Sequence, residues 1–74
     1  MRIITTKDFG ELIRDTRRKA KLTQAQLAAA SGTGQRFVRE LENGKATCQL
    51  AKALFVAQML GIKFEAQLPL LINE

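Results

Sequence analysis

The sequence predicts one mainly α-helical domain in which four short helices precede a single C-terminal β-strand. Two capping motifs, at Thr5 and Thr23, mark helix starts, and apolar residues recur at helical spacing through most of the chain. After Gly61 apolar and polar residues alternate, which is typical of a half-buried strand. A chain of 74 residues is long enough for one domain, which we expect to span residues 1–74.

The first two helices are expected at about residues 6–20 and 24–30. Each follows a Thr that can cap it, with Asp8 or Gln26 three residues later to complete a capping box. The spacing of apolar side chains on the first helix indicates one buried face, consisting of Phe9, Leu12, Ile13, Thr16 and Ala20. Gly32 suits the left-handed turn that ends the second helix.

The third and fourth helices are expected at about residues 35–43 and 48–60. Gly44 and Gly61 can end them, and Thr47 is the expected cap of the fourth. The residues expected to face inward are Val38 and Leu41 on the third helix, and Leu50, Ala53, Leu54, Ala57 and Leu60 on the fourth.

The predicted strand covers about residues 62–68 and needs a partner, because a single strand is not stable alone. The partner could be residues 2–4 of the same chain or the same strand of a second copy. The apolar tail beyond Pro69 favours the second copy, since this tail is costly to leave in water. The residues predicted at a dimer or partner interface are Ile62, Phe64, Ala66, Leu68, Leu70 and Leu71.

The composition argues against an enzyme and against bound metals or cofactors. The chain has one Cys and no His, so it offers neither a disulfide framework nor a zinc-ligand cluster, and the commonest general base is missing. We therefore expect no catalytic residue, metal ion or cofactor. The chain shows no signal peptide and no apolar run of roughly 20 residues, so a cytoplasmic protein without a membrane partner is expected.

The net charge of +5 is distributed unevenly along the chain. Residues 1–21 hold seven basic and three acidic side chains, residues 22–45 hold three and two, and the remaining residues are neutral overall. A basic first half suits a polyanion such as DNA, whereas the neutral second half suits a protein partner.

The start of the third helix carries side chains that are able to read DNA bases. Arg36 can bind guanine O6 and N7, and Gln35 can bind adenine N6 and N7. Arg39, one turn later, could reach either a base or a phosphate. Glu40 could accept a hydrogen bond from cytosine N4, or it could orient Arg36 four residues earlier on the same face.

Residues 22–45 resemble the xenobiotic-response-element type of helix-turn-helix, which lambdoid phage repressors share with many bacterial antitoxins. The matching positions are Leu22-Thr23-Gln24, Leu27-Ala28, Gly32, Val38, Leu41-Glu42, Gly44 and Leu60-Gly61. Residues 44–61 and the strand after them are similar to the HipB-like antitoxins. This resemblance implies a four-helix lambda-repressor-like fold and a homodimer whose C-terminal strands pair across the two-fold axis.

The resemblance also implies roles for individual residues. Gln35, Arg36, Arg39 and Glu40 fall on the base-reading face, and Arg17 and Glu42 fall where phage repressors hold a buried ion pair. The positions that imply contact with DNA phosphates are Gln24, Thr33, Asn43, Lys45 and Thr47. Gly34 departs from the family pattern, which usually has a capping Ser or Thr, or a DNA-contacting Lys, at that position.

The sequence therefore predicts a prokaryotic, nucleoid-associated repressor that binds double-stranded operator DNA as a homodimer. The HipB-like resemblance implies that it represses its own operon and acts as the antitoxin of a HipA-like serine/threonine kinase toxin. Two alternatives stay open. One is a phage-type or stand-alone repressor without a toxin, and the other is a module whose main role is to neutralise a protein partner.

Overall fold

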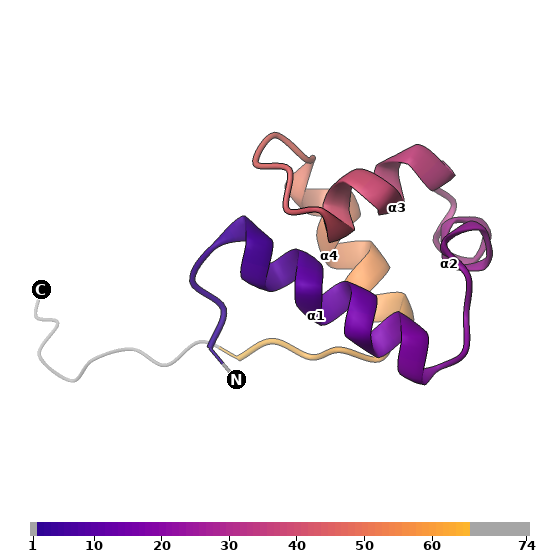
Figure 1. Ribbon diagram of the computed structural model, residues 1–74, viewed down its shortest axis with the longest axis horizontal. Coiled ribbons are helices and arrows are strands. Elements are labelled where there is room, and N and C mark those ends of the chain that lie inside the picture. Colours follow the sequence, from indigo (N-terminus) through magenta and orange to yellow (C-terminus); the bar gives the residue numbers. More distant parts are fainter. Residues whose placement is uncertain (1, 66–74) are drawn as a thin grey trace, which may run out of the picture.

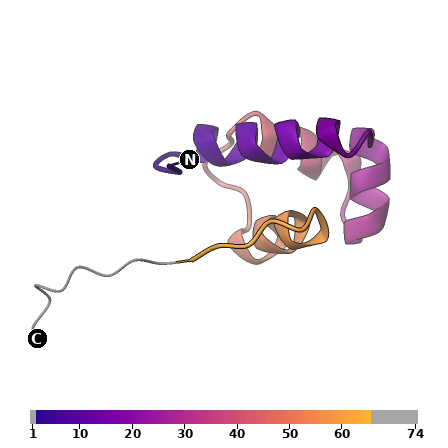
Figure 2. The ribbon, with the colours of Figure 1, turned by 90° about the horizontal axis from the view of Figure 1, so that it is seen from below.

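Four helices make up residues 2–65, the part of the chain that the computed structural model describes. They are α1 (Thr6–Lys19), α2 (Gln24–Ser31), α3 (Gln35–Glu42) and α4 (Leu50–Met59) (Figure 1). Each observed helix end lies within two residues of the expected one. α3 packs against both α1 and α2, and α4 packs against α2. Seen from below, α1 and α4 lie on opposite sides of the molecule, and α2 lies between them at one end (Figure 2).

Both expected capping boxes are present, and they explain where α1 and α2 begin. The Thr5 hydroxyl accepts a hydrogen bond from the Asp8 backbone N–H at 3.0 Å, and the Asp8 carboxylate accepts one from the Thr5 N–H at 3.1 Å. Thr23 and Gln26 make the same reciprocal pair at the start of α2. These bonds satisfy backbone donors that have no partner inside a helix.

The core lies between the four helices and consists of Ile13, Leu27, Ala28, Val38, Leu41, Ala53, Val56 and Ala57. The expectation for α4 was partly wrong. Leu50 is 70% exposed and Leu54 44%, whereas Val56, which was not expected inside, is fully buried. α4 also begins at Leu50 after Gln49, without a side-chain cap, so Thr47 does not cap it.

α1 and α3 approach so closely that only glycine fits between them. A Cβ atom placed on Gly10 would lie 2.7 Å from the backbone oxygen of Glu42 and closer still to that of Leu41. One placed on Gly44, whose φ is +80°, would lie 2.8 Å from the Cα of Lys7. Because Gly10 and Gly44 have no side chain, the end of α3 can pack directly against the backbone of α1.

Residues 62–65 form no strand within the described part of the chain, and neither do residues 2–4. The Phe64 ring instead stacks on Phe9, with the ring centroids 5.7 Å apart. The other residues of the expected strand and interface, namely Ala66, Leu68, Leu70 and Leu71, lie outside the described residues. No helix between residues 2 and 65 is long and apolar enough to cross a membrane.

Candidate nucleic-acid interface

The turn between α2 and α3 presents the start of α3 to solvent. Gly32 caps α2 in the left-handed conformation with φ +68°, and Gly34 precedes α3 without a side-chain cap. Val38 lies in the core, so the opposite side of the helix faces outward. The residues exposed on that side are Gln35, Arg36 and Arg39. Three of the four expected base-reading residues thus lie on one accessible helix surface.

Glu40, the fourth expected base reader, joins two basic side chains. Its Oε2 atom accepts a hydrogen bond from Arg36 Nε at 3.1 Å and lies 3.3 Å from Lys45 Nζ. The contacts with Arg36 first and with Lys45 second hold the pKa of the Glu40 carboxyl below its ordinary value. The carboxylate therefore stays ionised at neutral pH and ties the first turn of α3 to the loop that follows the helix.

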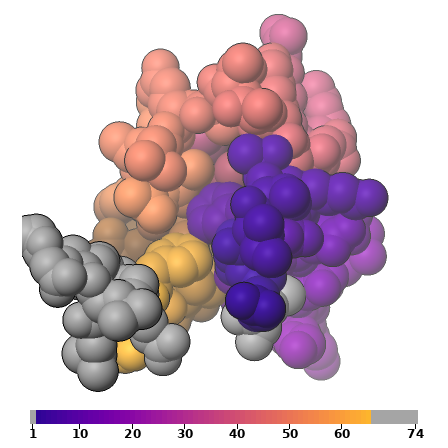
Figure 3. All heavy atoms as spheres, turned by 90° about the vertical axis from the view of Figure 1, so that its left-hand side faces the viewer, coloured from indigo at the N-terminus to yellow at the C-terminus, as the bar shows by residue number. Residues whose placement is uncertain are grey.

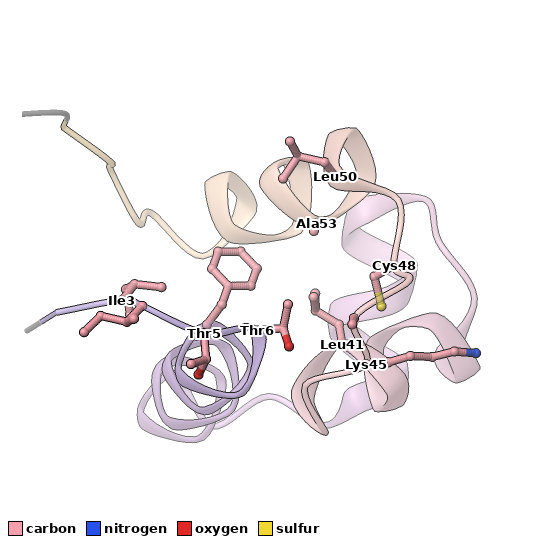
Figure 4. Close-up of a pocket in the computed structure, with 11 residues that line it drawn as sticks. Ile3, Thr5, Thr6, Leu41, Lys45, Cys48, Leu50 and Ala53 are labelled. Atoms are coloured by element: carbon pink, nitrogen blue, oxygen red, sulfur yellow. The ribbon is translucent and has the colours of Figure 1, made fainter.

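The loop after α3 carries three of the five expected phosphate contacts, and all three are exposed: Asn43, Lys45 and Thr47. The Thr6 hydroxyl donates a 2.7 Å hydrogen bond to the backbone oxygen of Gly44, which anchors this loop to α1. An apolar cavity of about 350 Å³ lies behind the loop, lined in part by Leu41, Cys48 and Ala53 (Figure 4). Lys45 is one of the lining residues, but its side chain extends outward and is 48% exposed, so its ammonium group faces solvent while it pairs with Glu40.

The other two expected phosphate contacts use their side chains inside the protein. Gln24 donates from Nε2 to Glu42 Oε1 at 3.0 Å. The Thr33 hydroxyl lies 3.0 Å from that of Ser31. Both side chains thus have internal partners, so contact with a phosphate would require their remaining polar atoms or a rearrangement.

Arg17 on α1 and Glu42 at the end of α3, which were expected to pair, form a buried ion pair. Arg17 binds both carboxylate oxygens of Glu42 through Nε and Nη2, the latter at 3.0 Å, and its Nη1 donates to the Leu22 backbone oxygen at 2.8 Å. The residues are 8% and 3% exposed. The hydrogen bond to Glu42 raises the pKa of Arg17 despite burial, so the guanidinium stays charged.

Comparison with known proteins identifies the family to which this chain belongs. Residues 13–67 match the helix-turn-helix family. The chain belongs to that family. It is also 43% identical over 68 residues to an uncharacterized HTH-type transcriptional regulator, y4mF, of Sinorhizobium fredii, which covers 92% of this chain and 90% of the relative.

Solved structures of HipB share the same fold. A complex of a serine-to-alanine variant of HipB with the O2 20mer superposes with a TM-score of 0.83 at 21% identity, over 90% of this chain and 93% of the other. The HipB-O4 20mer complex gives 0.83 at 19% identity, over 90% and 94%. The fold expected from the resemblance to HipB-like proteins is therefore confirmed for the four helices.

Within the helix-turn-helix motif, α2 and α3 are the two helices and α3 stands in the recognition position. Sequence reasoning missed two contacts of this site, those of Gln24 with Glu42 and of Lys45 with Glu40. The second had a signal, because Gly44 lets the chain turn back toward the helix that Lys45 follows. Among residues 2–65 no cluster of three or more His, Cys, Asp or Glu is able to hold a metal ion.

Proposed function

We propose that this protein is a sequence-specific, DNA-binding transcriptional repressor that acts as a homodimer on its own operon in a prokaryotic cytoplasm. As a finer part of the same proposal, it serves as the antitoxin of a HipA-like serine/threonine kinase toxin. The observation that carries the DNA-binding proposal is the exposed face of α3. This face presents Gln35, Arg36 and Arg39 at the recognition position of a helix-turn-helix, with Lys45 beside them.

The proposed roles divide these residues between bases and phosphates. Arg36, with 79% of its side chain exposed, reads a guanine, and Gln35 reads an adenine. Arg39 has no role fixed by geometry and contacts either a base or a phosphate. The phosphate contacts come from the exposed loop, with Asn43, Lys45 and Thr47 as the candidates, while Gln24 and Thr33 contribute near the start of α2 and in the turn.

Binding measurements with selected and random DNA test this proposal. The wild-type protein selects its preferred duplex from a random library, and fluorescence anisotropy then compares that duplex with a random one of equal length. We expect Arg36→Ala to cost about 1–3 kcal/mol on the selected duplex and to relax the preference at one base position. Arg18→Ala, which removes the same side chain and charge from an exposed site on α1, is the matched control. Equal losses on both duplexes in Arg36→Ala would contradict base reading.

The salt dependence of the affinity tests the phosphate contacts separately. Each phosphate that the protein neutralises releases counterions, so log K should fall with log salt at a slope of about −0.9 per contact. Replacing Lys45 by Ala should reduce that slope by roughly one contact without changing the base preference. An affinity that does not depend on salt would refute the proposed interface.

The proposed homodimer rests on apolar surface that is exposed among residues 2–65, the described part of the chain. On α4, Leu50, Leu54, Phe55 and Met59 are each at least 44% exposed, and Phe64 is 48% exposed. α4 and residues 62–65 lie beside the N-terminal part of α1 on one face of the molecule (Figure 3). A second copy placed on this face would bury these side chains and set two recognition helices about 34 Å apart on a pseudo-palindrome. A monomeric mass in light scattering at micromolar concentration would contradict it.

The toxin partnership is supported by the likeness in fold to HipB and by the neutral second half of the chain. Isolation of the tagged protein from its source cell tests it, with a stoichiometric kinase as the expected companion. The second candidate is a stand-alone repressor, which the 43% identity to a transcriptional regulator favours equally. Recovery of DNA without any stoichiometric protein would make the stand-alone repressor the better description.

A further inference from the structure

One carboxylate oxygen connects the two kinds of DNA contact proposed for this surface. Glu40 Oε2 lies 3.1 Å from Arg36 Nε, on the base-reading helix, and 3.3 Å from Lys45 Nζ, in the loop. The Glu40 side chain is 29% exposed, against 79% for Arg36 and 48% for Lys45. The Glu40 carboxylate is thus less exposed to solvent than the two cations that it binds.

This arrangement is poorly explained by folding stability. Ion pairs between solvent-exposed side chains contribute about 0–1 kcal/mol at most. A carboxylate on a surface that meets phosphates also opposes binding, because like charges repel. Its presence among Gln35, Arg36, Arg39 and Lys45 is better explained if it improves the selectivity of the cations that it holds.

The position of the hydrogen bond on Arg36 indicates how it does so. With Nε donating to Glu40, the two terminal amino groups of the guanidinium remain free and side by side. Two parallel N–H donors match the O6 and N7 acceptors on the major-groove edge of guanine. A guanidinium held at its Nε atom also loses less rotamer freedom when it docks.

We propose that Glu40 is a positioning residue, which orients Arg36 end-on toward a guanine and couples that base contact to the phosphate contact of Lys45. This inference rests on the proposed DNA-binding function. It also decides between the two roles that the sequence left open for Glu40, in favour of orienting Arg36. The remaining oxygen, Oε1, is the atom that direct reading of a cytosine N4 amine would use, and the experiment below separates that role.

A double-mutant cycle tests the inference, with Glu40→Ala and Arg36→Ala made alone and together. The measured quantity is the ratio of affinities for the selected duplex and a random duplex of equal length. Glu40→Ala should lower this ratio about two- to tenfold, the cost of ordering one free side chain. In the Arg36→Ala background it should lower the ratio no further. Glu40→Gln, which keeps an acceptor without the charge, should give an intermediate ratio.

Two further readouts exclude a general effect of charge or folding. Asp15→Ala removes one negative charge from an exposed position on α1 and should leave the ratio unchanged. Affinity for random DNA should not fall in Glu40→Ala, because a carboxylate has left a surface facing phosphates. Melting temperatures of all variants should stay within a few degrees of wild type, since the pairs involved are exposed.

The contrary results are distinct from those that would defeat DNA binding itself. A loss of the ratio in Glu40→Ala that is equal with and without Arg36, or that falls on a second base position, would overturn the inference and assign Glu40 to a base. An unchanged ratio in Glu40→Ala would also overturn it. If Arg36→Ala leaves the ratio unchanged, or if wild type selects no duplex, the proposed function itself fails.

Discussion

Breaking the buried Arg17–Glu42 ion pair should destabilise this domain more than any change on its DNA-facing surface. Both residues are more than 90% buried, and each depends on the other for two hydrogen bonds. Arg17→Met leaves the Glu42 carboxylate with the Gln24 amide as its partner, and Glu42→Gln leaves a guanidinium facing a neutral amide. Loss of one member of such a pair costs about 3–5 kcal/mol.

That loss is large for a domain of this size. At roughly 4–8 °C per kcal/mol, each single variant should melt at least about 12 °C below wild type. The double variant Arg17→Met/Glu42→Gln removes both charges, so its loss should fall short of the sum of the two single losses by at least about 1 kcal/mol.

Urea unfolding followed by far-ultraviolet circular dichroism measures these values, since the chain has neither Trp nor Tyr for fluorescence. Protein concentration is held constant, because the proposed dimerisation would make stability depend on it. The exposed pair Arg36–Glu40 is the comparison, where each Ala variant should cost at most about 1 kcal/mol. Additive losses in the buried cycle would refute the coupling, and losses no larger than those of the exposed pair would refute the assigned cost of burial.

Three further predictions concern Gly10, Lys21 and Asp8, which lie in or just after α1, with Gly34 before α3 as a comparison. Gly10→Ala should cost about 1–3 kcal/mol in urea unfolding, because its methyl group meets two backbone oxygens of α3. Gly34→Ala, which has open space, should cost at most about 1 kcal/mol, the preference of a helix N-cap for Gly over Ala. Lys21→Gly should raise the melting temperature, because Lys21 occupies the left-handed region at φ 60° and glycine adopts that conformation without steric cost. An unchanged or lower melting temperature would contradict this. Hydrogen bonds from the Ile4 and Thr5 backbone N–H groups lower the pKa of Asp8 below its ordinary value. Wild type should therefore exceed Asp8→Asn in melting temperature above about pH 4 and lose that advantage as acid protonates Asp8. A difference that does not depend on pH would count against this.

The sequence predicted the first three helices well because their signals are local. A capping box depends on four consecutive residues, and a glycine ends α2 because it readily adopts the left-handed conformation. Arg36 and Glu40 were also identifiable as neighbours, because residues four apart share a helix face. By contrast, Arg17 and Glu42 are 25 residues apart, so their pairing came from the family resemblance and not from local pattern.

The buried face of α4 could not be predicted in the same way, because apolar residues cover most of the helix surface, with Lys52 and Gln58 as its polar residues. Ala53, Val56 and Ala57 share one face of the helix. Leu50 and Leu54 lie on one side of this face and Phe55 and Met59 on the other, so periodicity indicates no single stripe. The structure places the smaller side chains inside against the core, where α4 packs on α2. Close helix packing favours small residues at the contact, and that preference depends on the neighbouring helix, which the local sequence does not specify.

The same ambiguity bears on how the molecule works. A helix that served only to close the core of a small monomer would need one apolar face, and its other side would be polar in water. α4 instead exposes four large apolar side chains, and Phe64 adds a fifth beside α1. Two apolar faces on one helix imply two packing surfaces. One surface is used within this chain, and the other is the one that the proposed second copy would cover, because a repressor that reads a pseudo-palindrome requires two recognition helices held at a fixed spacing.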